Sequence, residues 1–269
     1  MKKKARTLMK NSVRRMSAVV LSLSFVLGTS VGVRADEADA MRLLKAMSDY
    51  VSAQNAVAFA YDASLEIVTT DEQRLALASS GTVTLDRPDK LRFMRSSGFV
   101  DVEMSFDGET LTVMGKNMNL YAQIDVPGTI DHLFDELRDT YNRPIPGADL
   151  LSSNSYESLM LGVVDVKDLG SGMIGGVECD FLAFREEEVD WQIWIAQGER
   201  PYPCRYVITS KLIAGGPQYT IQIRDWKTGD EVAATDFSFT NPTNARKGNL
   251  EDLANSGDLP GHFQIGEAQ

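Results

Sequence analysis

The feature that most constrains the fold of this 269-residue chain is a run of alternating apolar and polar residues from Gly81 to Met114. Apolar side chains recur at every second position in four successive segments, which is the period of a strand with one buried face. Arg87-Pro88-Asp89 and Asp107-Gly108 lie between segments and suit tight reversals of the chain. The run is therefore expected to form an antiparallel meander of four strands.

The same stretch contains the pattern G-x-V-x-L-x-R-P-x-K-L-R, which begins at Gly81, and then F-D-G-E-x-L-x-V, which begins at Phe106. These motifs resemble a segment of the LolA/LolB-like proteins, periplasmic carriers whose curved sheet wraps a hydrophobic cavity. Within that superfamily the chain is most similar to an uncharacterised family of predicted periplasmic proteins, over a region from about Glu37 to about Ala245. The resemblance implies a mainly β (α+β) fold. Its elements would be a curved antiparallel sheet or half-open β-barrel of about 11–12 strands, an N-terminal helix and a helical lid over the concave face.

Residues 1–35 have the layout of a secretory signal peptide. A basic segment ending at Arg15 precedes an apolar run from Ala18 to Val33, and small residues follow up to Ala35. This order is typical of export signals, so we expect cleavage near Ala35 and a periplasmic mature protein. The apolar run is short for a spanning helix. We therefore expect no stable membrane insertion, with a retained anchor as the alternative.

Loss of the signal peptide would make the chain strongly acidic. Residues 1–35 hold eight Lys or Arg and no acid, so the formal net charge would change from -11 to -19. Such a surface repels nucleic-acid phosphates and anionic head groups. No nucleic-acid partner is therefore expected.

Helical spacing marks three segments outside the meander. Residues 36–54 repeat apolar side chains every three or four positions, and Thr129 is a suitable N-cap for a helix that runs to Tyr141. A shorter apolar piece spans residues 156–161. We expect the two later segments to cover the concave face as the lid.

Prolines and alternation divide the rest of the chain. Pro144 and Pro146 are expected only to stop the second helix. In the C-terminal part, apolar and polar residues alternate again up to Phe237 and Phe239, which are expected to lie in a strand. One domain over residues 36–245 is expected, because all-β units of this length commonly stay undivided. The polar residues 246–269 are expected to form a poorly ordered tail.

Inward-facing aromatic, methionine and aliphatic side chains are the main candidate site. A sheet of this many strands is not filled by its own side chains unless helices cover it, so we expect apolar space for a lipid or acyl chain. The competing interpretation is that these side chains simply pack a closed core. The cavity candidates are Phe59, Tyr61, Leu65, Phe93, Met104, Leu133, Phe134, Leu137, Trp191, Ile193, Tyr206 and Tyr219.

Two cysteines, Cys179 and Cys204, would face an oxidising compartment, which favours a disulfide. Strand register, however, places both opposite about Ile195 from different sides, roughly 9 to 10 Å apart. A bridge needs Cα atoms within about 7 Å, which requires Cys204 to lie in a bend at Pro203. The sequence leaves both the bridged and the reduced pair open.

A glycine pattern and an acidic run have simple interpretations. The pattern G-x-G-x-x-G begins at Gly170, but residues 177–181 after it indicate a strand, whereas a dinucleotide site needs a helix there. The acidic run at residues 186–188 fits a solvated hairpin turn better than a calcium loop or a catalytic pair of carboxylates.

Histidines offer no catalytic or metal-ligating constellation. His132 and His262 have no nucleophile or ligand partner at a recognisable spacing. We therefore expect no enzymatic activity, no metal and no cofactor.

The resemblance implies a non-catalytic periplasmic binding or carrier protein for a hydrophobic ligand, a lipid or lipoprotein acyl chain held in the concave apolar cavity. Its expected partners are that hydrophobic molecule and, in addition, a lipoprotein or envelope protein. The alternative on the same fold is a periplasmic regulatory or envelope-stress sensor that acts through protein contacts.

Overall fold

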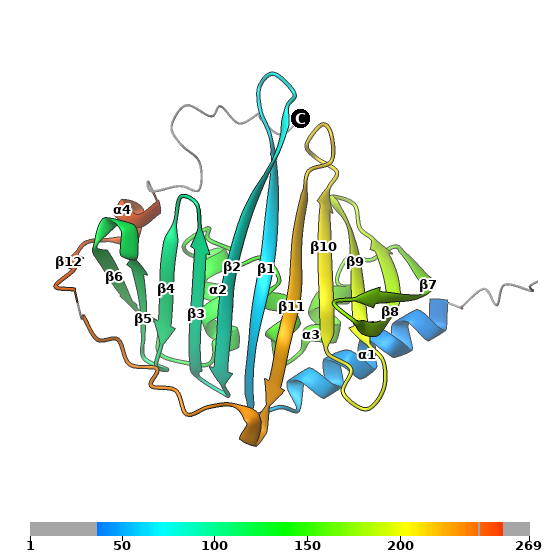
Figure 1. Cartoon of the computed structure of the whole chain (residues 1–269), viewed down its shortest axis with the longest axis horizontal. Helices are drawn as coiled ribbons and strands as arrows, with labels where there is room; N and C mark the ends of the chain where they lie inside the picture. The colour runs from blue at the N-terminus through cyan, green and yellow to red at the C-terminus, as the bar shows by residue number, and fades with distance from the viewer. Residues whose placement is uncertain (1–36, 242, 255–269) are drawn as a thin grey trace, which may run out of the picture. The chain divides into compact units, whose positions relative to one another are not determined.

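The computed structural model describes residues 37–241 and 243–254 (Figure 1). The expected signal peptide and His262 lie outside these ranges. The strands are β1 (Ala56–Val68), β2 (Arg74–Asp86), β3 (Lys90–Ser97), β4 (Asp101–Phe106), β5 (Thr110–Gly115), β6 (Leu120–Asp125), β7 (Asp165–Ile174), β8 (Val177–Arg185), β9 (Val189–Ala196), β10 (Pro203–Ser210), β11 (Gln218–Thr228) and β12 (Arg246–Lys247). The helices are α1 (Glu37–Ser52), α2 (Ile130–Asp139), α3 (Ser155–Met160) and α4 (Leu250–Ala254), with 3-10 turns η1 (Lys116–Met118), η2 (Ala148–Leu151) and η3 (Gly229–Glu231).

All twelve strands belong to one sheet, in the order β12-β6-β5-β4-β3-β2-β1-β11-β10-β9-β8-β7 (Figure 1). The pairs are antiparallel except that of β12 with β6, which is parallel. β12 and β7 end the order, so the sheet formed by the described residues is open. The expected fold class, a curved mainly antiparallel sheet preceded by an N-terminal helix, is confirmed.

The turns and caps form where the sequence places them. Gly108, between β4 and β5, has a φ of 91°, a conformation that residues with a Cβ rarely adopt. Thr129 caps α2 as expected, because its side-chain oxygen accepts a hydrogen bond of 3.2 Å from the backbone N–H of His132. These local features connect each strand to its neighbour and hold α2 at the end of the meander.

Helix α1 fills one half of the sheet's inner face. Its residues Ala40, Leu44, Met47 and Val51 are fully buried, and the helix contacts β7, β9, α3 and η2. Apolar side chains from these elements form one continuous core with the inward faces of the central strands. This half is packed by side chains alone, as a stable core requires.

The segment after β11 differs from the prediction. Phe237 and Phe239 were expected to lie in a strand, but residues 232–241 form none. The segment instead runs along the lower edge of the strands from β11 towards β12 (Figure 1), where Phe239 packs on Tyr121 with ring centroids 4.9 Å apart. Alternation alone does not distinguish a strand from an extended segment that lies across other strands.

Candidate functional site

A partly open cavity of about 280 Å³ lies against the inner face of the sheet, in the half that α1 does not fill. Inward-facing residues of β1, β2, β3, β4 and β11 form its floor. Phe134 of α2, together with residues 144–148 after that helix, covers it. The cavity thus lies under a helix and a short connecting segment.

Cross-strand register arranges the floor in rows. One row contains Phe59, Val83, Phe93 and Met104 on four adjacent strands, so this part of the floor is apolar and aromatic. The next row towards the β1–β2 turn contains Tyr61, Gly81, Arg95 and Val102 in the same strand order. The floor therefore changes from apolar to partly polar along the direction of the strands.

Tyr61 connects the two rows. Its ring stacks on that of Phe93 with centroids 5.8 Å apart and an interplanar angle of 15°, and its hydroxyl donates a 3.1 Å hydrogen bond to the carbonyl oxygen of Met94. The ring lies over Gly81, where an added Cβ would stand 2.4 Å from the tyrosine oxygen. Burial raises the pKa of Tyr61, so its phenol is neutral at pH 7 and can donate this hydrogen bond.

Seven of the twelve predicted cavity residues line the cavity, and five do not. Those that line it are Phe59, Tyr61, Leu65, Phe93, Met104, Phe134 and Tyr219. Those that lie in the packed core instead are Leu133, Leu137, Trp191, Ile193 and Tyr206, all of them buried.

The five core residues correct the predicted site, because neighbouring side chains enclose them. Leu133 and Leu137 are buried on α2 next to Phe134, which alone of the three reaches the cavity. Trp191 stacks on Phe184 at 3.8 Å between centroids and meets Tyr206 edge-on at 5.7 Å. Trp191 therefore packs against aromatic side chains of the core and does not line the cavity.

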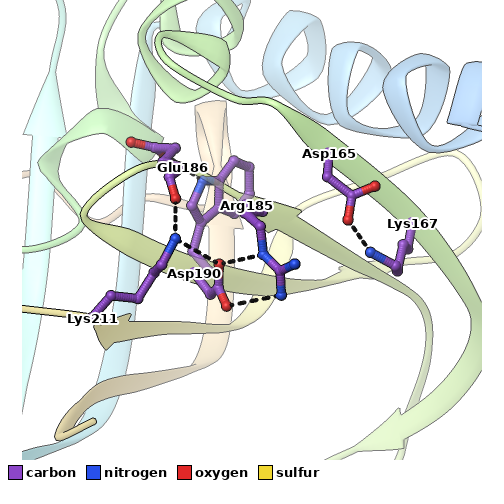
Figure 2. Close-up of polar contacts among 7 residues, drawn as sticks. Asp165, Lys167, Arg185, Glu186, Asp190 and Lys211 are labelled. Atoms are coloured by element: carbon purple, nitrogen blue, oxygen red, sulfur yellow. Dashed lines mark hydrogen bonds and ion pairs between the residues drawn. The ribbon is translucent and has the colours of Figure 1, made fainter. Parts of the chain in front are cut away.

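A polar contact with Glu186 also fixes Trp191. Glu186 lies in the turn that was predicted to be merely solvated, near Lys211 and the pair of Arg185 and Asp190 (Figure 2). The indole Nε1 donates a 2.7 Å hydrogen bond to Oε1 of Glu186, and Lys211 donates to the backbone oxygen of the same residue at 2.5 Å. Arg185 and Asp190 form an ion pair of 3.1 Å beside it. Glu186 therefore orients a core residue, which the acidic run did not reveal.

Replacing Glu186 with glutamine is expected to change how stability depends on pH. Burial raises the pKa of Glu186, and the hydrogen bond from Trp191 only partly offsets this. A carboxyl with a raised pKa in the folded state contributes stability at pH values below its unfolded pKa, and this contribution is lost as the pH rises through the folded pKa. The variant should therefore gain stability relative to the wild type between pH 4 and pH 7, by a fraction of about 1 kcal/mol for this half-exposed group.

Urea unfolding of both proteins at several pH values measures this difference. Glu187→Gln, at an exposed side chain of the same turn, is the matched control for the removal of a surface carboxylate. A Glu186→Gln variant that loses stability relative to the wild type between pH 4 and pH 7 would contradict the expected sign.

The main element that sequence reasoning missed is the segment of residues 144–148. Pro144 and Pro146 were expected only to stop a helix, yet both line the cavity together with Ile145. The second expected lid piece, α3, packs against α1 and η2 instead. Two prolines around an apolar residue are the signal in the sequence, since they give a stiff extended segment that exposes a hydrophobic side chain.

The two cysteines lie side by side as free thiols. Cys179 and Cys204 are both buried and pack together with Ala196. Cys204 occupies an irregularity in the β9–β10 pairing, between Pro203 and Arg205, which is the bend that contact between the cysteines requires. Burial raises the pKa of both thiols.

The remaining patterns form no second site in the described part of the chain. The strand expected after the glycine pattern is β8. Within residues 37–241 and 243–254, no three His, Cys, Asp or Glu side chains are grouped as metal ligands. Over the same residues, no helix combines the length and the apolar character needed to cross a bilayer.

Comparisons with known proteins identify one matching family. The family model described as "Predicted periplasmic protein (DUF2092)" matches residues 40–250. No curated protein matches the chain.

Several solved structures are similar to this one at low sequence identity. The lipoprotein LppX of Mycobacterium tuberculosis is 12% identical, with 75% of this chain and 100% of that chain covered and a TM-score of 0.39. LprF from Mycobacterium bovis is 11% identical, with 75% and 98% covered and a TM-score of 0.44. A LolA superfamily protein from Nitrosomonas europaea is 12% identical, with 71% and 94% covered and a TM-score of 0.32. These TM-scores are too low for any property of those proteins to be carried over to this chain.

Proposed function

The chain belongs to the DUF2092 family of predicted periplasmic proteins, and on this premise we propose that it is a non-catalytic periplasmic carrier of a hydrophobic small molecule or acyl chain. The observation that carries the proposal is the cavity of about 280 Å³ with mostly apolar walls. Small-molecule sites are typically concave and apolar, with a few polar groups that orient the ligand. This cavity has that composition.

The walls favour binding over chemistry. Phe93, Met104 and Phe134 offer a flexible and aromatic surface that can bind hydrocarbon chains in more than one conformation. Each methylene group moved from water into such surroundings contributes about 0.8 kcal/mol, so a chain of a few carbons would bind measurably. Among the described residues that line the cavity there is no histidine, cysteine or carboxylate, the groups that most often act as base or nucleophile.

Native mass spectrometry of protein exported to the periplasm tests the proposal. The expected result is a co-purifying hydrophobic molecule, and delipidated protein that takes up a fluorescent fatty acid. Protein that carries no such molecule and takes up none of the probe would overturn the carrier function.

Filling the cavity from its floor should abolish uptake without unfolding the protein. Ser79 lines the cavity, so Ser79→Phe would place a ring in the space that the ligand occupies. We expect affinity for the probe to fall at least about tenfold, or ~1.4 kcal/mol, when measured by fluorescence titration. The adjacent Ala78 is exposed because successive residues of a strand face opposite sides. Ala78→Phe is therefore the matched control, and equal losses in the two variants would argue against binding in this cavity.

A second candidate function, a sensor that acts through protein contacts, is favoured by one surface. Leu161, Val164 and Met173, before and within the edge strand β7, are 78%, 75% and 65% exposed. Edge strands with exposed apolar side chains are sites where another chain can add a strand. Crosslinking in intact periplasm tests it: one captured envelope protein, lost on Met173→Glu, would support the sensor function over a carrier that acts alone.

A further inference from the structure

Arg95 is the one charged side chain among the described residues that line the cavity. It lies on β3, opposite Gly81 of β2 and Val102 of β4, and it is half-buried. A guanidinium keeps its charge at every physiological pH. The guanidinium of Arg95 therefore brings a positive charge to a mostly apolar wall.

The neighbours of Arg95 make this end of the cavity polar. Its positive charge acts on the phenols of Tyr61 and Tyr219 and lowers their pKa values, but burial outweighs this and raises both. The two hydroxyl groups are therefore neutral at pH 7. Ser79, which lies one row further towards the β1–β2 turn, adds a third hydroxyl. The Tyr61 hydroxyl donates its proton to the Met94 carbonyl, so the hydroxyls of Tyr219 and Ser79 and the guanidinium of Arg95 form the set of donors suited to an anion.

The opposite end of the cavity is apolar. Phe93 and Met104 belong to the row next to that of Tyr61 and Arg95 and carry no polar side-chain group, and Phe134 covers the cavity from α2. A ligand that spans the cavity would thus meet donors at one end and hydrocarbon at the other. This is the arrangement that recognises an amphiphile rather than a wholly apolar molecule.

The size of the cavity limits the number of chains. Its volume of about 280 Å³ is just below the range for small-molecule sites, roughly 300–1,000 Å³. A lipid with two or three chains would not be enclosed. A single chain fits this space.

We propose that the ligand is a single-chain amphiphile with an anionic head group, carboxylate or phosphate, and that Arg95 binds the head group while the chain extends towards Phe93 and Phe134. The proposal rests on the carrier function and specifies its ligand class. It also assigns Arg95 a role in specificity: the acidic surface expected of the mature protein would disfavour anions, and this side chain reverses that preference inside the cavity.

Four probes with the same twelve-carbon chain separate the head group from the chain. Dodecanoic acid, dodecyl phosphate, dodecanol and dodecyltrimethylammonium are each titrated against delipidated protein, with displacement of the neutral dye N-phenyl-1-naphthylamine as the readout. The wild type should bind both anions at least about tenfold more tightly than the alcohol, since hydrogen bonds between charged groups are stronger than those between neutral groups. A difference between the two anions would identify carboxylate or phosphate as the preferred head group.

Variants of Arg95 then test the residue itself. Arg95→Gln should bring the ratio of acid to alcohol affinity close to one while alcohol affinity stays within about twofold, and Arg95→Lys should restore part of the ratio. Arg92→Gln removes a positive charge from the same strand but on its other face, where Arg92 pairs with Glu103, and should leave the ratio unchanged.

Each outcome decides one of the two proposals. Equal affinity for all four probes, preference for the ammonium probe, or an anion preference that persists in Arg95→Gln would overturn the head-group assignment and leave the carrier function standing. Failure of every probe to displace the dye would overturn the carrier function itself. Alcohol binding in each variant shows that it is folded.

Discussion

Replacing Gly81 with alanine is expected to lower the free energy of unfolding by about 3 kcal/mol, since overpacking of a closed site costs ~1–3 kcal/mol and displacement of a hydrogen-bonded hydroxyl adds to this. A Cβ at this position would lie 1.9 Å from the carbonyl oxygen of Met94 and 2.4 Å from the hydroxyl oxygen of Tyr61. The first is backbone of the neighbouring strand and cannot rotate away. The Tyr61 ring would also have to leave the cavity floor.

Urea unfolding followed by tyrosine and tryptophan fluorescence measures the loss. Gly98, between β3 and β4, is the matched control because an added Cβ there meets no atom within 4 Å, so Gly98→Ala should change stability by no more than about 0.5 kcal/mol. Similar stabilities for Gly81→Ala and the wild type would show that the tyrosine does not pack over this position.

Protein that folds in the periplasm is expected to contain a disulfide between Cys179 and Cys204, and its loss is expected to lower stability by about 3 kcal/mol, the value for a closed loop of roughly 25 residues. The two buried thiols are in contact and Cys204 lies in the required bend. Because burial raises the pKa of both thiols, little thiolate is present once the strands have closed. The bond should therefore form during folding, in an oxidising compartment.

Intact mass measured under denaturing conditions checks the bond: the exported protein should become heavier by two hydrogens after it is reduced. The double variant Cys179→Ala, Cys204→Ala is the control, because its stability should not respond to reductant. Iodoacetamide labelling of both cysteines in denatured, unreduced protein would show that the pair stays reduced.

Most of the fold could be predicted because its signals are local. Alternation marks strands residue by residue, and Asp107-Gly108 and Thr129 fix where the chain turns or a helix begins. Consecutive strands joined by short turns usually pair with one another, so the order β1 to β6 follows from the sequence. Phe237 and Phe239 show the limit, since an extended segment alternates whether or not it joins a sheet.

The candidate site was only partly predictable because it depends on how distant segments meet. Phe59, Tyr61 and Phe93 face inward by alternation alone, and all three line the cavity. Trp191 faces inward as well, but α1 and its aromatic neighbours fill its half of the sheet. Arg95 was not singled out because a charged residue is usually assigned to solvent. Alternation puts Arg95 on the same face of β3 as Phe93, and the structure places it on the cavity wall.

Because only one half of the inner face is filled, we expect the two halves of the sheet to tolerate mutations differently. In the half that α1 covers, a change in side-chain volume either opens a void or crowds a full core, and both are costly. In the other half the void already exists, so a larger or smaller residue on its floor reshapes the space at little expense to folding, except at Gly81, where Tyr61 and the neighbouring strand leave no room for a Cβ. The ligand that the protein prefers can therefore change, in evolution or by design, through substitutions at a few floor positions, while the packed half maintains the fold.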